Sequence, residues 1–139
     1  MAQMIFVNLP VTDLDTTKSF FSKLGFSFNP QFSDDKTACL VISDTIFAML
    51  LTEPRFKEFT KKEIADTRTT TEVLLALSAE SRAKVDEMAD TALASGGSPA
   101  NEPMDHGFMY GRSFQDPDGH TWEVIWMDPA AVAGEGAQG

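Results

Sequence analysis

Among the side chains able to do acid–base or ligand chemistry, the most informative is a glutamate inside an apolar strand. Glu123 lies in the segment 121–126 (TWEVIW), which directly follows the turn sequence 116–120 (DPDGH). Side chains alternate between the two faces of a strand, so Glu123 points the same way as Ile125, while the flanking tryptophans point the other way. Burial would disfavour the ionised form of this carboxyl unless a donor compensates. We expect Glu123 either to act as a general base or substrate acceptor, or to pair with a neighbouring donor and fix the sheet.

Few other residues can contribute to such a site. The candidate donors near Glu123 are Asn8, His106, Tyr110 and Arg112. His106 precedes a predicted strand and is either a surface histidine or a group at the mouth of a pocket. His120, in the turn itself, is expected to be structural or exposed. Cys39 lies in an apolar run and is expected to be buried, so neither an internal disulfide nor a thiolate zinc site is predicted.

The first half of the chain predicts one helix and four strands. Asp13 can cap the helix, and Gly25 fits the position after its end. The strands are expected at residues 4–11, 26–32, 36–42 and 45–52.

The second half repeats this order after a polar segment, residues 53–71. That linker is expected to contain a short helix and either to pack onto the body through Phe56 and Phe59 or to form a lid over a pocket. Ser78 or Ser81 can cap the second helix, and Gly96 can end it. Strands are expected at residues 72–77, 98–103, 108–114 and 120–127, followed by a flexible tail at 129–139.

Composition narrows the possible partners. The chain has 139 residues, of which 42% are hydrophobic, and this predicts a single globular domain over residues 1–128. The net charge of −10 argues against nucleic acid and anionic membranes, which both need a basic surface. No signal peptide or membrane span is expected, which favours a cytoplasmic protein.

The two β-α-β-β-β modules resemble the vicinal oxygen chelate superfamily, which contains glyoxalases, bleomycin-resistance proteins and extradiol dioxygenases. The resemblance covers nearly the whole chain and is most specific at residues 8–13 with 20–26, and at 114–123. The sequence is most similar to a branch labelled "lactoylglutathione lyase-related". The resemblance implies an α+β fold in which modules 4–52 and 72–128 form curled sheets around a cavity. It also implies that modules pair either within the chain or across a homodimer, and with two modules in the chain we expect a homodimer with two pockets.

In this superfamily a divalent metal, when present, is held by side chains on the first and last strands of the modules. Glu123 matches one of these positions, whereas the others fall at Phe6, at Met49 or Leu50, and at Leu74. Three apolar side chains cannot coordinate a divalent ion. We therefore expect no metal and no other cofactor. The alternative is a metal site on Glu123 with an unpredicted partner such as Asn8 or Glu72.

The function predicted from the sequence is the binding of a small molecule, or metal-free catalysis, in a mainly apolar pocket. The alternative is a metal-dependent lyase or dioxygenase of the glyoxalase type. A third possibility is a dimer with a filled cavity and only an interaction role. Beside the tentatively catalytic Glu123, the predicted ligand-binding residues are Phe6, Asn8, Leu50, Leu74, His106, Tyr110 and Arg112.

Overall fold

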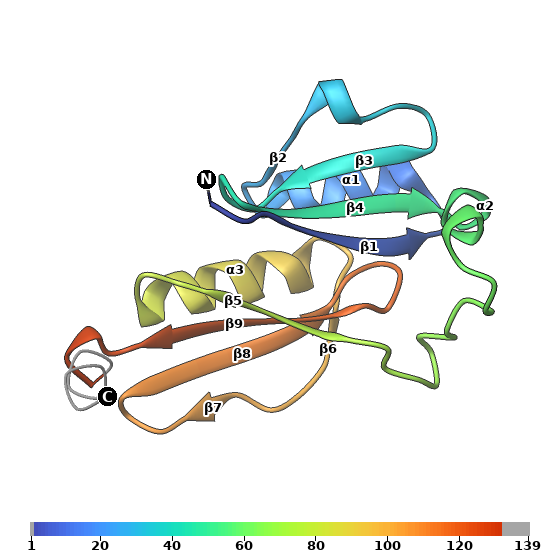
Figure 1. Ribbon diagram of the computed structural model, residues 1–139. Helices are drawn as coiled ribbons and strands as arrows, with labels where there is room; N and C mark the ends of the chain where they lie inside the picture. The colour runs from blue at the N-terminus through green and yellow to red at the C-terminus, as the bar shows by residue number, and fades with distance from the viewer. Residues whose placement is uncertain (1, 132–139) are drawn as a thin grey trace. The chain divides into compact units, whose positions relative to one another are not determined.

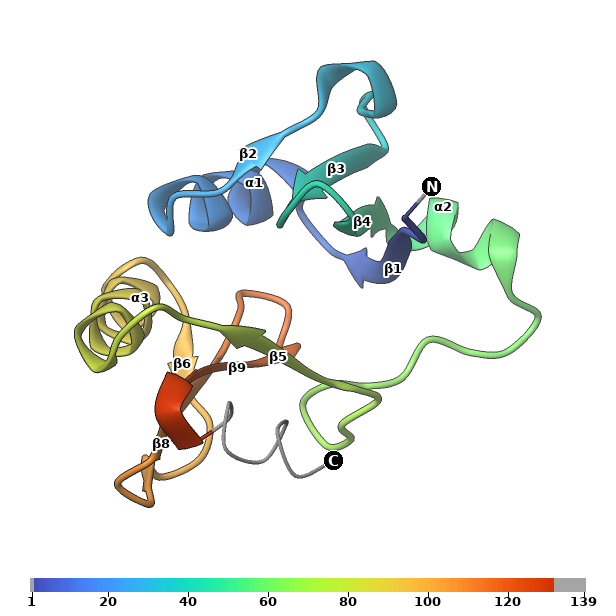
Figure 2. The same ribbon diagram turned by 60° about the vertical axis from the view of Figure 1, so that its left-hand side comes forward.

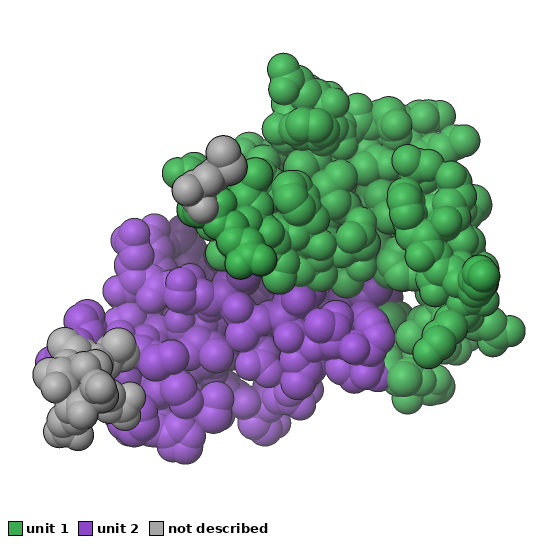
Figure 3. All heavy atoms as spheres, in the orientation of Figure 1, with its two compact units in different colours: residues 1–70 green, residues 71–139 purple. Residues whose placement is uncertain are grey.

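The computed structural model describes residues 2–131, and the chain divides into two compact units (Figure 3). Unit 1 is Met1–Thr70 and unit 2 is Thr71–Gly139. Each unit has its own sheet and its own long helix, called sheet A with α1 and sheet B with α3 (Figure 1). This is the predicted α+β architecture of two similar modules. The expected tail at 129–139 lies mostly outside the described residues.

Sheet A has the strand order β1-β4-β3-β2, in which β1 runs parallel to β4 and the other pairs are antiparallel. The elements of unit 1 that form its core are β1 (Ile5–Val11), α1 (Leu14–Lys23), β2 (Ser27–Phe28), β3 (Thr37–Val41) and β4 (Ile46–Thr52). The side chain of Asp13 caps α1 by accepting from the amides of Asp15 and Thr16. Gly25 follows the helix with φ of 99°, a conformation that favours glycine.

The strand predicted over residues 26–32 is shorter in the structure. β2 ends at Phe28, and a 3₁₀ helix, η1 (Pro30–Phe32), follows it. The side chain of Asn29 caps η1 by accepting from the amide of Gln31. Pro30 lacks an N–H group and has a fixed φ, so it suits the first helical position better than the interior of a strand. The alternating phenylalanines predict a longer strand, but the strand ends at Phe28 because Asn29 and Pro30 start a 3₁₀ helix.

The first part of the predicted linker contains the expected short helix, α2 (Glu53–Phe56), followed by the 3₁₀ helix η2 (Lys57–Phe59). α2 contacts β1 and β4, while Phe59 is 66% exposed. The guanidinium of Arg55 lies over the Phe59 ring, 5.1 Å from its centre. Phe59, in η2, thus packs against Arg55 of the preceding helix α2 rather than into the core of unit 1.

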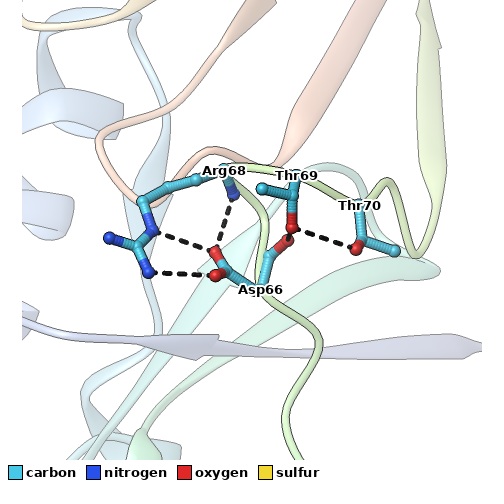
Figure 4. A network of polar contacts seen from close by, with 4 residues as sticks. All are labelled: Asp66, Arg68, Thr69 and Thr70. Atoms are coloured by element: carbon cyan, nitrogen blue, oxygen red, sulfur yellow. Dashed lines mark hydrogen bonds and ion pairs between the residues drawn. The ribbon is translucent and has the colours of Figure 1, made fainter.

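A polar turn ends unit 1 (Figure 4). The Asp66 carboxylate accepts from the backbone amide of Arg68 and from two nitrogens of its guanidinium, at 2.9 to 3.0 Å. The amides of Thr69 and Thr70 donate to the Asp66 carbonyl. The Arg68 side chain is 87% exposed, so this ion pair shapes the turn locally but contributes little to stability.

Sheet B has the order β5-β9-β8-β6, with β7 also paired to β8. Its elements are β5 (Leu74–Ser78), α3 (Arg82–Ala94), β6 (Ser98–Pro99), β7 (Met104–Asp105), β8 (Met109–Gln115) and β9 (Thr121–Met127). α3 packs against β8 and β9 along one face of the sheet, as both ribbon views show (Figures 1 and 2). The cap of α3 is Ser81, whose hydroxyl accepts from the amide of Lys84, and not Ser78.

Of the edge strand predicted at residues 98–103, only the first two residues form a strand, β6, and a second short strand, β7, follows the predicted range. Pro99 and Pro103 flank the break between them, and neither can donate to a ladder. In the described part of the chain, no helix is both long and apolar enough to cross a bilayer.

Candidate functional site

The turn before β9 is built around a buried carboxylate. Oδ1 of Asp116 accepts from the amides of Asp118 at 2.9 Å and His120 at 3.1 Å, and Oδ2 accepts from the indole N–H of Trp122 at 3.0 Å. Gly119 has φ of 83°, as the turn sequence predicts. Burial raises the pKa of Asp116, and His120 and the Trp122 N–H oppose that rise. Asp116 is therefore a structural residue that orients the start of β9.

His120 is 1% exposed, which confirms the structural reading of this histidine. Its Nδ1 atom lies 2.7 Å from Oε1 of Glu72. Glu72 precedes β5, and β5 runs parallel to β9. The contact thus joins the starts of two neighbouring strands. It also commits Glu72, one of the alternative metal partners considered for Glu123, to a bond with a buried histidine.

The register of sheet B fixes which side chains share a face with Glu123. Ala76 and Ser113 lie opposite Glu123 on the two neighbouring strands. Opposed residues point to the same side of a sheet, as do residues two apart on one strand. Leu74 and Ile125 therefore lie on the Glu123 face. This face is the one turned away from α3, whereas Trp122 is buried on the α3 side, as predicted.

A pocket of about 200 Å³ opens on this face of sheet B. It is lined by Asn101, Glu102, Met104, Gly111, Arg112, Ser113, Glu123 and Ile125. Its floor is at Gly111: a Cβ atom there would lie 3.3 Å from Cγ1 of Ile125 and 3.9 Å from Cε of Met104. The missing side chain of Gly111 therefore leaves room for part of the pocket.

Glu123 is half-buried at this pocket. Among residues 2–131, no side chain or backbone group forms a hydrogen bond or ion pair with its carboxylate. The sequence left two predictions for Glu123. The one in which its carboxylate pairs with a neighbouring donor finds no such donor among residues 2–131. Its oxygens are instead available to a bound molecule.

Tyr110 and Arg112, predicted as donors to Glu123, lie on the other face of β8. The Tyr110 hydroxyl donates to Asp86 at 2.5 Å, and the Arg112 guanidinium donates to Asp86 at 3.1 Å and to Asp90 at 2.8 Å. Both acceptors belong to α3. The Tyr110 hydroxyl and then Arg112 lower the pKa of Asp86, while Asp86 raises the pKa of Tyr110. The two residues join β8 to α3, and Arg112 reaches the pocket lining without directing its charge to Glu123.

His106 is exposed in the turn between β7 and β8, where its ring stacks on that of Phe108 with 6.3 Å between centres. It is not among the residues that line the pocket. Arg82, at the start of α3, holds this turn by pairing with Asp105 and lies 4.5 Å from the centre of the Tyr110 ring. The geometry therefore supports the surface reading of His106.

The unit 1 residues divide between the two faces of sheet A. Phe6 and Asn8 lie on the face turned away from α1, where Phe6 is 50% exposed and stacks on Phe47 at 5.0 Å. Met49 is opposite Asn8 and shares this face. Leu50 is opposite Leu9 and is fully buried on the α1 side. Of the two residues considered for this ligand position, the register therefore places Met49, not Leu50, with Phe6.

The structure also tests whether the residues present suit a metal. Cys39 is buried as expected, and burial raises the pKa of its thiol, which disfavours the thiolate that binds metals. Over the described residues 2–131, no three His, Cys, Asp or Glu side chains cluster closely enough to hold an ion. With apolar residues at the other superfamily ligand positions, the donor set around Glu123 does not fit a divalent metal.

The fold and this site define the class of protein. Residues 3–124 match the model of the Glyoxalase/Bleomycin resistance protein/Dioxygenase superfamily, and the chain belongs to this superfamily. No curated protein matches the sequence. The "lactoylglutathione lyase-related" branch stays a prediction.

Solved structures agree with this assignment. A hypothetical protein from S. aureus is 26% identical with a TM-score of 0.76, and the match covers 91% of this chain and 95% of that one. A family enzyme from Burkholderia phytofirmans PsJN is 15% identical with a TM-score of 0.74, covering 91% and 99%. A lactoylglutathione lyase from Agrobacterium tumefaciens is 16% identical with a TM-score of 0.67, covering 91% and 94%. At 15% and 16% identity the last two likenesses show the fold alone.

Sequence reasoning missed most of the pocket lining. Gly111 and Ser113 alternate along β8 with the predicted donors Tyr110 and Arg112 and lie on the opposite face from them. Side chains alternate between the two faces along β8, so the sequence does divide Gly111 and Ser113 from Tyr110 and Arg112. Which of the two pairs shares a face with Glu123 follows only from the register between β8 and β9. Met104 was missed because β7 is too short to give an alternation signal.

Proposed function

We propose that the protein binds a small molecule without a metal, on the face of sheet B that is turned away from α3, with Glu123 as its principal polar contact. The observation that carries this proposal is the Glu123 carboxylate, which faces a pocket of about 200 Å³ and has no protein partner within residues 2–131. A carboxylate without a protein donor keeps both of its oxygens free to accept hydrogen bonds from a ligand. Its position also matches the superfamily's carboxylate ligand.

Two chemical roles are open to Glu123 at this place. As an acceptor, its two oxygens can bind a donor group of a ligand. As a general base, it can remove a proton from a bound substrate held within hydrogen-bond distance. Both roles use the same geometry, and neither requires the metal that the donor set fails to fit. Homodimer formation stays a prediction from the resemblance.

The direct test is to identify what the protein holds when purified under native conditions. Small molecules released by denaturation would be identified by mass spectrometry, with Glu123→Gln and Gly111→Ala purified in parallel. We expect a compound that is enriched with the wild-type protein and depleted in both variants. Glu80→Gln, an exposed substitution on the loop before α3, is the matched control and should retain the compound.

Metal analysis of the same preparations tests the metal-free part of the proposal. We expect no divalent ion in stoichiometric amount after dialysis. A bound transition metal that is lost in Glu123→Gln would overturn the metal-free reading and favour the glyoxalase-type lyase or dioxygenase.

A further inference from the structure

The pocket on sheet B carries negative charge that no lining group neutralises. Glu102 and Glu123 both line it, and no ion pair of either is formed within residues 2–131. Arg112 is the one lining residue with a cationic side chain, and its guanidinium is bound to Asp86 and Asp90 of α3. The carboxylates of the pocket therefore face no protein cation.

The Ser113 hydroxyl in the pocket is already engaged with the backbone of Asn101. The Ser113 hydroxyl accepts from the backbone N–H of Asn101 at 2.8 Å and donates to the backbone carbonyl of Asn101 at 3.4 Å. These bonds hold the loop between β6 and β7 against β8 and form the wall of the pocket. The strongest polar contacts open to a ligand are then the carboxylates of Glu102 and Glu123, because hydrogen bonds to charged groups are stronger than those to a neutral carboxamide such as that of Asn101.

The rest of the pocket is mainly apolar and small. The side chains of Met104 and Ile125 both approach the position that a Cβ atom of Gly111 would take. The volume of about 200 Å³ lies below the range of about 300–1,000 Å³ typical of sites for drug-sized ligands. The pocket thus suits a short apolar group attached to one strongly donating head.

We propose that this pocket selects a small monocation, a protonated amine carrying a short apolar group, with the ammonium on Glu123 and the apolar group against Met104 and Ile125. The proposal rests on the proposed function and names the class of ligand. An ammonium has three donors and no acceptor, so it can bond to the oxygens of Glu123 without bringing an acceptor toward the carboxylates of the pocket. The net charge of −10 adds a long-range attraction for cations, which salt screens.

The experiment uses three probes of similar shape and different charge: benzylamine, benzyl alcohol and benzoate. Binding to the full chain is followed by NMR through the methyl signals of Met104 and Ile125 and the amide signal of Gly111. We expect benzylamine to bind at least fivefold more tightly than benzyl alcohol and benzoate not to bind. A tenfold increase in salt concentration should weaken benzylamine binding and leave benzyl alcohol unchanged.

Variants assign the selectivity to the named residues. In Glu123→Gln we expect about a tenfold loss of benzylamine affinity, the size expected for a hydrogen bond to a charged group, and less than a twofold change for benzyl alcohol. Glu102→Gln should have a smaller effect, and Glu80→Gln none. Gly111→Ala should weaken both probes, because a methyl group would enter the floor of the pocket.

The possible failures are distinguishable. Equal affinity for the three probes at these signals would overturn the ammonium preference and leave small-molecule binding in the pocket intact. Amine selectivity that survives in the Glu102→Gln/Glu123→Gln double variant would also overturn it. If no probe shifts these signals, and the natively purified protein carries no compound that Glu123→Gln loses, both the ligand class and the proposed function fail.

Discussion

The Nδ1 atom of His120 lies 2.7 Å from a carboxylate oxygen of Glu72, and this contact ties the start of β9 to the start of β5. The two strands are parallel neighbours, with Leu74 opposite Thr121. His120 is almost fully buried, whereas the Glu72 side chain is 26% exposed. Glu72 therefore gives a buried imidazole ring a polar partner close to the first residues of unit 2.

Removing Glu72 should destabilise the protein. In Glu72→Ala, His120 loses this partner while its ring stays buried, which costs about 1–3 kcal/mol of unfolding free energy. Urea denaturation followed by circular dichroism measures the difference. Glu80→Ala, at an exposed position on the same unit, should change stability by less than about 0.5 kcal/mol. Equal effects of the two substitutions would show that the His120 contact is not stabilising.

Asp116→Asn should be destabilising although it keeps the size of the side chain. An amide group has one acceptor oxygen, whereas the Asp116 carboxylate accepts from two backbone amides with one oxygen and from the Trp122 indole with the other. The expected loss is about 1–3 kcal/mol, and the Trp122 fluorescence should change with it. Asp44→Asn, at an exposed position in unit 1, is the control. An unchanged melting temperature for Asp116→Asn contradicts the assignment.

The pH dependence of stability should reveal the Asp86 carboxylate. The Tyr110 hydroxyl and Arg112 lower its pKa, so ionised Asp86 stabilises the fold. This contribution is complete above the ordinary carboxyl pKa of about 3.9 and is lost as the pH falls through the lower folded value. Asp86 is 48% exposed, so the contribution is about 1 kcal/mol at most.

We therefore expect Asp86→Asn to be less stable than the wild type above about pH 5 and equally stable once the pH is below the folded pKa of Asp86. Denaturation curves at a series of pH values measure this convergence. A stability difference that stays constant over the whole acid range would mean that ionisation of Asp86 is not the cause.

Glu123→Gln should leave stability unchanged within about 0.5 kcal/mol, because no described residue between positions 2 and 131 bonds to this carboxylate. The same variant should lose ligand affinity. Glu123 would then contribute to binding but not to the stability of the fold. Thermal unfolding without ligand provides the measurement. A loss of several kcal/mol would reveal a structural partner for Glu123 and return it to a sheet-fixing role.

The sequence predicts the architecture well because its signals are local. Asp13 caps α1, Gly25 and Gly96 end the helices with positive φ, and the turn at Asp116 forms as its residue types require. Predictions failed where two local signals competed, as at Pro30, where the alternating phenylalanines favoured a strand and the proline favoured a 3₁₀ turn.

The site was harder to predict because it depends on register and on face. Glu123 was found from its place in β9, but its neighbours across the sheet follow from the pairing of Ser113 with Glu123. If that pairing shifted by one residue, Tyr110 and Arg112 would lie on the pocket face in place of Gly111 and Ser113. Its donor groups made Arg112 a candidate partner of Glu123, but in the structure its guanidinium binds Asp86 and Asp90 of α3.

In each unit the first strand, β1 or β5, pairs with the strand made last, β4 or β9. A growing chain on the ribosome therefore cannot complete either sheet until the last strand of that sheet has been synthesised. Sheet A, however, needs no residue beyond Thr52, so its ladder can close before any strand of sheet B has emerged. Such pairings distant in sequence fold slowly, and this order of synthesis favours folding of the chain in two successive steps, one for each unit.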